Sequence, residues 1–232
     1  MSPLALAPNI SMHGLLPGDL SSGNIAFNGF YEPALSGHIV QLARQGGLLV
    51  DVGANMGYFS LLWAGSNPNG RVISFEAAPR NIALLENNVA QNRLADRMTI
   101  VPKAAGKSTG TISFDNGPAI QTVWGGITSS VAASTITVPL VRLDQELPDA
   151  SIDVLKIYVE GADTWVLFGC EALLKKKRIG TLFFEQNRER MELLGIAAGE
   201  AQTFLRDLDY TREPLGGDDG EWVARPNGRP AS

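Results

Sequence analysis

Two carboxylates stand at the ends of two predicted strands, with a turn of small residues between them. Asp51 lies in the apolar run 48–52, and Glu76 ends the run 71–76. The turn contains Gly53, Ala54, Asn55 and Gly57. Such a turn lets backbone N–H groups approach a ligand closely, and a carboxylate at the end of the next strand can accept hydrogen bonds from both hydroxyls of a ribose. The pattern predicts a nucleotide-cofactor site.

The spacing of the glycines separates two classes of cofactor. A dinucleotide fingerprint reads G-x-G-x-x-G, and Asn55 stands where its second glycine would admit a pyrophosphate. Asp51 would repel a pyrophosphate and attract the cationic amino-acid portion of S-adenosylmethionine. The sequence therefore favours S-adenosylmethionine over NAD. In this region we expect the cofactor to contact Asp51, Gly53, Ala54, Asn55, Gly57, Tyr58, Phe59, Glu76 and Ala77.

The segments around the turn predict the elements that hold it. The run 48–52 suits a strand buried on both faces of a parallel sheet, and the apolar residues from Met56 to Trp63 suit a helix packed on that sheet. A helix opens at Pro79, with Asn88 among the residues expected to face water. Other strands are predicted at 98–104, 111–114, 136–141, 152–159 and 181–185, other helices at 31–44, 162–178 and 199–208, and a hairpin at 209–213 with 221–225.

A second group of functional side chains ends the predicted strand 152–159. Tyr158 and Glu160 stand there, followed by Gly161. Because parallel strands present their carboxyl ends at one edge of a sheet, we expect these residues near the reacting centre. Glu160 is the predicted general base. Tyr158, with an ordinary pKa of about 10, is a better hydrogen-bond donor than a base.

Longer stretches of the chain resemble one protein family. The runs VDVGANMGYFSLL, RVISFEAAPRNIALLENNV, VPLVRLDQEL, LLKKKRIGTLFFE and VLKIYVEGADTWVLFGCEALL are similar to the FkbM family of S-adenosylmethionine-dependent methyltransferases, over roughly residues 47 to 186. Many methyltransferases share DVGAN, whereas LKI-x-VEG is more diagnostic. The resemblance implies a Rossmann-like class I methyltransferase fold of the α/β class, in which helices cover both faces of a mostly parallel seven-stranded sheet with an antiparallel C-terminal strand.

The resemblance also extends the set of site residues. It places Ala104 where methyltransferases contact the adenine, and it suggests that Tyr31 and Glu32 reach the methionine end of the cofactor. For Glu32 an equally valid interpretation is an acidic first turn of a helix. The implied acceptor is a small molecule, a sugar or a specialised metabolite, methylated on a hydroxyl.

Tyr158 departs from the family pattern, which reads LKIDVEG. The substitution can be an adaptation to another acceptor, an engineered change, or the mark of a member that has lost chemistry. Without an acid at this position, the oxygen-rich site that Glu185 and Gln186 could complete for magnesium is weakened, and we predict no metal. The alternative function is therefore an S-adenosylmethionine-binding protein with little or no catalytic activity. A dehydrogenase ranks third.

Composition agrees with a small acceptor. The chain has 232 residues, with 19 basic and 24 acidic side chains and a formal net charge of −5, which gives no reason to expect a nucleic acid as substrate. Cys170 is the sole cysteine of the sequence and fits a buried thiol in a reducing compartment. No apolar run is long enough to span a membrane, so we expect a cytoplasmic protein.

The ends and one internal loop complete the expected organisation. Residues 1–30 predict an extended arm, which could be a disordered leader, a cover for the cofactor or part of a homodimer interface. Residues 31–226 predict one methyltransferase domain, and 227–232 a frayed tail. The loop 115–135, rich in Gly, Ser and Thr, is either a substrate lid with Trp124 as an apolar wall or a disordered segment.

Overall fold

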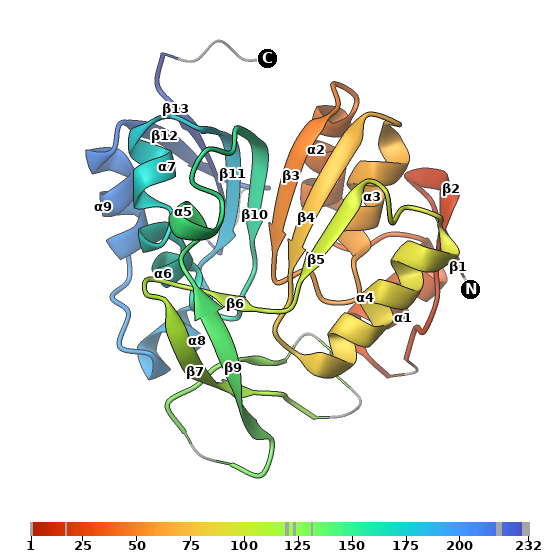
Figure 1. Cartoon of the computed structure of the whole chain (residues 1–232), viewed down its shortest axis with the longest axis horizontal. Coiled ribbons are helices and arrows are strands. Elements are labelled where there is room, and N and C mark those ends of the chain that lie inside the picture. The colour runs from red at the N-terminus through yellow and green to blue at the C-terminus, as the bar shows by residue number, and fades with distance from the viewer. Residues whose placement is uncertain are drawn as a thin grey trace. The chain divides into compact units, whose positions relative to one another are not determined.

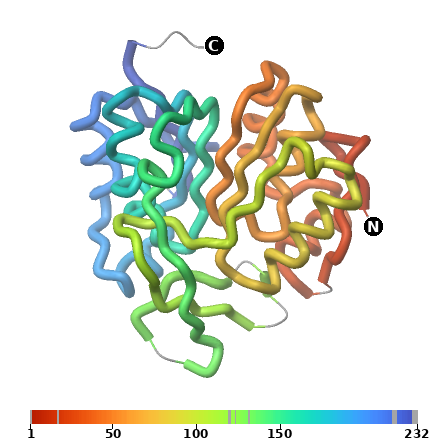
Figure 2. Tube along the Cα trace, in the orientation of Figure 1, coloured from red at the N-terminus to blue at the C-terminus, as the bar shows by residue number. Residues whose placement is uncertain are grey.

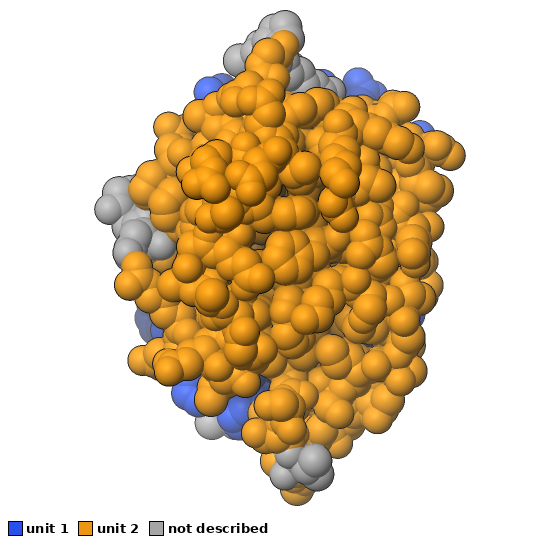
Figure 3. All heavy atoms as spheres, turned by 90° about the vertical axis from the view of Figure 1, so that its left-hand side faces the viewer, with its two compact units in different colours: residues 1–102, 116–125 blue, residues 103–115, 126–232 orange. Residues whose placement is uncertain are grey.

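The computed structural model describes residues 2–16, 18–118, 121–122, 124–130, 132–216 and 220–228. The chain divides into two compact units (Figure 3). Unit 1 comprises residues 1–102 and 116–125, and unit 2 comprises residues 103–115 and 126–232. The expected single domain over 31–226 stays a prediction.

Unit 1 is built on three parallel strands with the order β3 (Gly47–Val52), β4 (Gly70–Phe75) and β5 (Met98–Val101) (Figure 1). Its helices include α2 (Pro33–Ala43), α3 (Tyr58–Ser66) and α4 (Pro79–Gln91). Residues 49–52 of β3 are buried, as predicted for a strand covered on both faces. The strands and helices that flank the glycine turn therefore follow the predicted pattern.

The N-terminal segment is folded, so the prediction of an extended arm is wrong. Strands β1 (Ser2–Leu4) and β2 (Ala7–Met12) form an antiparallel hairpin, and α1 (Leu20–Asn28) follows (Figure 2). The hairpin packs on α3, where a Cβ added to Gly65 would lie 2.2 Å from Cγ1 of Ile10. Ala7, Ile10 and Met12 of β2 are buried, and the contacts of β2 with α3 explain the ordered strand.

Helix α4 holds the hairpin through two asparagines, of which Asn88 was predicted to face water. Asn88 is fully buried, so that prediction is wrong. Its Oδ1 accepts a hydrogen bond from the backbone N of His13 at 2.7 Å, and its Nδ2 donates to the carbonyl of Met56 at 3.0 Å. Asn92 likewise accepts from the backbone N of Ser11 at 3.0 Å and donates to its carbonyl at 2.8 Å. A polar side chain tolerates burial here because backbone groups satisfy it.

Unit 2 contains a sheet of its own strands. β10 (Ile152–Ile157) and β11 (Ile179–Glu185) are parallel, whereas β13 (Glu221–Pro226) runs antiparallel to both β11 and β12 (Tyr210–Pro214). The predicted hairpin is confirmed for these strands, and residues 217–219 of its turn lie outside the described part. The four strands of unit 2 follow the order β12, β13, β11 and β10. The α/β class, the mostly parallel sheet and its antiparallel C-terminal strand are confirmed.

A second sheet also belongs to unit 2, with the order β6 (Ala104–Ala105), β9 (Thr135–Val141), β7 (Gly110–Asp115) and β8 (Gly126–Ile127). The predicted strand 98–104 is therefore two elements, because Ala104 pairs with Leu140 of β9. The other helices of this unit are α5 (Leu143–Glu146), α6 (Asp163–Phe168), α7 (Glu171–Lys175), α8 (Arg188–Leu193) and α9 (Glu200–Asp207).

The predicted helix 162–178 is broken into α6 and α7. The break lies at Gly169, whose carbonyl accepts a hydrogen bond from the backbone N of Asp144 at 2.9 Å. A Cβ at this position would lie 2.1 Å from the carbonyl oxygen of Gly106. The close backbone approach requires glycine and ends the helix. Over the described ranges, no helix is long and apolar enough to cross a membrane.

Candidate active site

The turn between β3 and α3 has the tight geometry that its small residues predict. Gly53, Asn55 and Gly57 have positive φ angles of 76°, 52° and 95°. The backbone N–H groups of Gly53 and Ala54 both donate to the carbonyl of Phe75 at 3.0 Å, and the N–H of Gly57 donates to the carbonyl of Ala54 at 2.8 Å. The first two bonds tie the turn to the end of β4, and the third closes the turn on itself.

Glu76 is joined to this turn by its carboxylate. It is 6% exposed, and its Oε2 accepts a hydrogen bond from the backbone N of Asn55 at 2.7 Å. Its Oε1 accepts from the backbone N of Ala77 at 3.0 Å and of Ala78 at 2.8 Å. The structure therefore brings Glu76, Asn55 and Ala77 together, as the sequence predicts for a cofactor site. The bond from Glu76 to a ribose stays a prediction.

The side chain of Asp51 connects β3 with α3. It is fully buried, and its Oδ2 accepts a hydrogen bond from Oγ of Ser60 at 2.6 Å. The hydroxyl of Ser60 is in turn 2.9 Å from that of Ser74, which is paired with Asp51 across β3 and β4. Asp51 thus fastens α3 to the sheet behind the turn, and its contact with the cofactor stays a prediction.

Aromatic side chains surround the start of α3. The ring centroids of Tyr58 and Phe59 lie 5.0 Å apart, and Tyr31 contacts both rings at 6.3 and 6.4 Å. The hydroxyl of Tyr58 lies 3.0 Å from Oγ of Ser36. Burial raises the pKa of Tyr58, and the nearby charge of Glu32 adds to this effect. Unit 1 therefore brings together three residues that the sequence predicts for the cofactor site, namely Glu32, Tyr58 and Phe59.

The side chain of Asn55 makes a contact that the sequence did not indicate. Its Nδ2 donates to Oγ1 of Thr122 at 3.1 Å. Its Oδ1 is buried and receives no hydrogen bond from the described residues. Such an acceptor suits the ammonium or hydroxyl groups of S-adenosylmethionine, which are hydrogen-bond donors. The residues of the turn therefore fit the predicted cofactor.

Within unit 1, helix α4 holds part of the loop 115–135. Arg80, in the first turn of α4, donates to the carbonyls of Pro118 and Gln121, each at 2.5 Å. Trp124, the predicted apolar wall, is 49% exposed. Residues 119, 120, 123 and 131 of this loop lie outside the described part. A role as a substrate lid stays a prediction.

In unit 2, Glu160 occupies a constrained turn after β10. Its φ angle is 56°, and that of Gly161 is 90°. A Cβ on Gly161 would lie 2.4 Å from Cβ of Arg190, so glycine is required there. Burial and the charge of Glu185 raise the pKa of Glu160 to about 7, although Arg190, with Nε 3.9 Å from Oε2, opposes the shift. A carboxylate of this kind can accept a proton near neutral pH.

Asp163 supports the same turn, and the sequence did not single it out. It is fully buried, and it accepts hydrogen bonds from the backbone N of Glu185 at 3.0 Å and of Val159 at 3.4 Å. Burial, with the charge of Glu185, holds the pKa of Asp163 well above its ordinary value. The signal that the sequence offers for Asp163 is its position two residues after the LKI-x-VEG motif.

The other predicted residues of unit 2 are Tyr158 and Ala104. The half-buried ring of Tyr158 lies 5.0 Å from Nζ of the buried Lys156, a cation–π contact. Ala104 is buried in β6. Their predicted contacts with acceptor and adenine stay predictions. In the ranges that the structure describes, no cluster of three His, Cys, Asp or Glu side chains could hold a metal ion.

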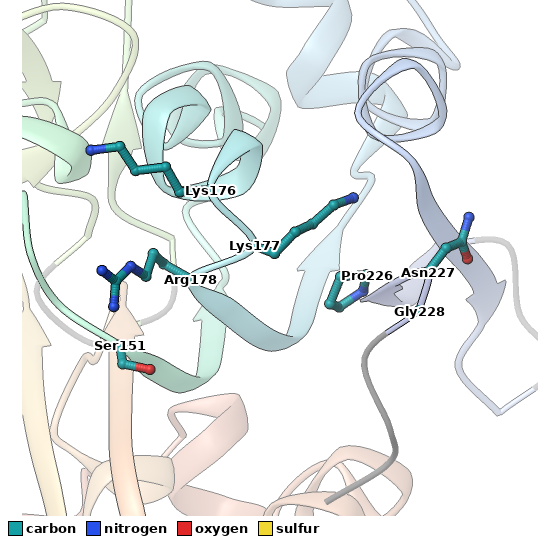
Figure 4. A pocket seen from close by; sticks show the side chains of 7 residues that line it. All are labelled: Ser151, Lys176, Lys177, Arg178, Pro226, Asn227 and Gly228. Carbon is teal, nitrogen blue, oxygen red and sulfur yellow. The ribbon is translucent and has the colours of Figure 1, made fainter.

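A cavity in unit 2 contains none of the predicted site residues. It measures about 670 Å³ and lies where β10 and β11 begin and β13 ends (Figure 4). Lys177 points away from Lys176 and Arg178 in the close view, and its Nζ donates to the carbonyls of Leu208 and Asp209. Because the cations diverge, the cavity does not form a convergent anion site. It is lined by Ser151, Lys176, Lys177, Arg178, Pro226, Asn227 and Gly228.

Comparisons with solved structures agree with the class of fold. An FkbM methyltransferase from Methylobacillus flagellatus KT matches with a TM-score of 0.55 and 17% identity, over 78% of this chain and 43% of that one. The chain thus spans less than half the length of that protein. A Podospora anserina methyltransferase, PaMTH1, solved with bound S-adenosylhomocysteine (SAH), matches with a TM-score of 0.52 and 12% identity, over 84% and 79% of the two chains. The fold is that of a class I methyltransferase.

Sequence comparison identifies the family. The model of the methyltransferase FkbM domain matches residues 51–211. Methyltransferase sdnD of Sordaria araneosa is 28% identical over 181 residues, covering 61% of this chain and 68% of that protein. The chain belongs to the FkbM methyltransferase family, whose methyl donor is S-adenosylmethionine.

Proposed function

We propose that this protein transfers the methyl group of S-adenosylmethionine to a hydroxyl of a sugar or specialised metabolite. The observation that carries the proposal is the turn of residues 53–57, held at the end of β3 by Glu76. This arrangement joins the two parts of a nucleoside site, a close backbone turn and a carboxylate on the next strand. Family membership supports the methyltransferase class, and the hydroxyl acceptor is our inference.

The cofactor residues of unit 1 would act by holding and orienting the donor. When bound, S-adenosylmethionine supplies an electrophilic methyl group attached to a sulfonium. Glu76 would accept hydrogen bonds from ribose hydroxyls, and Oδ1 of Asn55 would accept one from a further donor of the ligand. The residues of unit 1 proposed for this role are Glu32, Asp51, Gly53, Ala54, Asn55, Gly57, Tyr58, Phe59, Glu76 and Ala77. Ala104, in unit 2, is proposed from the family resemblance alone.

Glu160 and Tyr158 are the residues proposed to handle the acceptor. A hydroxyl must lose its proton as its oxygen is methylated, and a base with a pKa near the working pH takes that proton most effectively. The pKa of about 7 for Glu160 meets this requirement. Tyr158 would donate a hydrogen bond that orients the acceptor oxygen.

The test is methyl transfer from labelled S-adenosylmethionine to a panel of sugars, phenols and aliphatic hydroxyl compounds, with amines as the comparison class. Transfer to a hydroxyl compound that falls strongly in Glu160→Gln supports the proposal. Transfer to amines alone contradicts the hydroxyl assignment.

The alternative is a protein that binds S-adenosylmethionine without transferring its methyl group. Tyr158, in place of the aspartate of LKIDVEG, motivates this second function. The two functions differ in the behaviour of Tyr158→Asp. If this variant transfers methyl groups to the panel and the unmutated protein does not, the unmutated protein binds S-adenosylmethionine without transferring its methyl group.

A further inference from the structure

A buried carboxylate outside the predicted site lies at the start of α1. Asp19 is 1% exposed and caps this helix, with Oδ1 accepting hydrogen bonds from Oγ of Ser21 at 2.7 Å and from the backbone N of Ser22 at 2.8 Å. Helix capping explains this oxygen. Helix capping does not account for the contacts of the second carboxylate oxygen, Oδ2.

Oδ2 of Asp19 points to the loop that follows β7. It accepts hydrogen bonds from the backbone N of Thr122 at 2.6 Å and from Oγ1 of Thr122 at 2.9 Å, across 103 residues of sequence. Thr122 is itself 2% exposed, and its carbonyl accepts from Nδ2 of Asn81 at 3.0 Å. Burial acts to raise the pKa of Asp19, but the hydrogen bonds from Thr122, Ser22 and Ser21 outweigh it and lower the pKa. Asp19 is therefore an ionised acceptor.

The charge of Asp19 fixes the direction of the next hydrogen bond. The hydroxyl of Thr122 has one proton, which it gives to the carboxylate, so it can only accept from Asn55. The amide of Asn55 must then turn its NH₂ group towards Thr122. Its Oδ1 is left buried on the opposite branch of the amide, in the cofactor turn.

We infer that Asp19 and Thr122 are positioning residues for the cofactor: through this relay they make the Asn55 side chain present an acceptor to a donor group of the ligand. The inference rests on the proposed function, because it assigns the turn to S-adenosylmethionine. Without the relay the amide of Asn55 is free to rotate and offer NH₂ to a ligand N–H or O–H. The ligand donor then loses its partner.

The experiment is calorimetric titration with SAH, which keeps the amino-acid and ribose groups of the cofactor. Thr122→Val removes the hydroxyl at nearly constant volume and should weaken binding by about tenfold, the usual cost of a buried donor left without its acceptor. Thr122→Ser restores the hydroxyl and should restore affinity. Asp19→Asn should weaken binding in the same way, because an NH₂ group cannot accept from Thr122.

Two further variants separate positioning from general stability. Ser21→Ala removes a hydrogen bond from the other oxygen of Asp19 and should lower the melting temperature without changing SAH affinity. Asn55→Gly accommodates the positive φ angle and removes the amide. In the Asn55→Gly background, Thr122→Val should have no further effect on SAH affinity, because Thr122 then has no amide to orient.

The outcomes are distinct. Unchanged SAH affinity in Thr122→Val, equal weakening in Thr122→Ser, equal weakening in Ser21→Ala, or an additive effect in the Asn55→Gly background each overturns the inference while the proposed function stands. Failure of the unmutated protein to bind SAH overturns the proposed function, and the inference with it.

Discussion

At the scale of single residues, three residues of the predicted site have a backbone conformation that side chains disfavour, which Arg93, Lys177 and Asp209 adopt elsewhere. Glu32, Asn55 and Glu160 have positive φ angles of 43°, 52° and 56°, although each carries a side chain. Asparagine tolerates this conformation, whereas glutamate adopts it rarely. Strain of this kind persists where the surroundings enforce it, and it concentrates at functional sites. Three residues chosen from sequence for their chemistry are thus also residues that the fold holds in costly conformations.

Glu160→Gln tests the proposed base directly. The amide keeps the size of the side chain but cannot take a proton, so turnover should fall by about a hundred- to ten-thousand-fold, the usual contribution of a positioned base. Affinity for SAH should stay unchanged, because Glu160 is not one of the proposed cofactor residues. Steady-state kinetics and titration measure the two quantities. Full activity in the variant would remove Glu160 from the base role.

The pH dependence of turnover follows from the pKa of Glu160. Since burial raises this pKa to about 7, the carboxyl is protonated, and inactive as a base, at lower pH. Turnover should therefore rise as pH increases through about 7. A rate profile between pH 5.5 and 8.5, in buffers of constant ionic strength, gives the result. A rate that is level across this range would show that another group accepts the proton.

At the scale of elements, the sequence predicts what short-range patterns determine. The turn after β3 could be predicted because glycine spacing and an apolar run are local signals. The β1–β2 hairpin, the burial of Asn88 and the Asp19–Thr122 bond could not be predicted. These features depend on hydrogen bonds between residues 75 to 103 positions apart in the sequence. In each bond a polar side chain pairs with a backbone group, and every residue type carries such a group, so no sequence pattern marks the partner. Glu160 and Asp163 are intermediate cases. The motif shows where they lie in the sequence, but it does not show the burial and the nearby charge of Glu185 that raise their pKa values.

Asn88→Ala tests how α4 holds the N-terminal hairpin. The substitution leaves the buried backbone N of His13 and carbonyl of Met56 without this partner, and it should lower the free energy of unfolding by about 1–3 kcal/mol. Chemical denaturation measures the change. Asn87→Ala is the matched control, because Asn87 is the exposed neighbour on the same helix. Equal effects of the two substitutions would refute the structural role of Asn88.

At the scale of the whole molecule, three carboxyls of unit 2 link stability to pH. Burial raises the pKa of Glu160, Asp163 and Glu185 above their ordinary values. Each therefore binds its proton more tightly in the folded than in the unfolded chain. As pH rises from about 4.5 to about 7, the unfolded chain releases these protons first, so the free energy of unfolding should fall.

Denaturation at several pH values in this window measures the effect. Glu160→Gln removes one of the three titrating groups and should make the dependence shallower. Asp19 does not interfere, because its pKa is lowered from 3.8 and it stays ionised throughout the window. Stability that increases between pH 4.5 and 7 would contradict the raised pKa values of these carboxyls.

The central claim is that the turn of residues 53–57 and Glu76 form a site for S-adenosylmethionine. Calorimetric titration of the purified protein with SAH, with NAD as the control, tests it before any acceptor is known. We predict micromolar binding of SAH and no binding of NAD, because Asn55 and Asp51 disfavour a pyrophosphate at this turn. Binding of NAD without SAH, or of neither ligand, would contradict the claim.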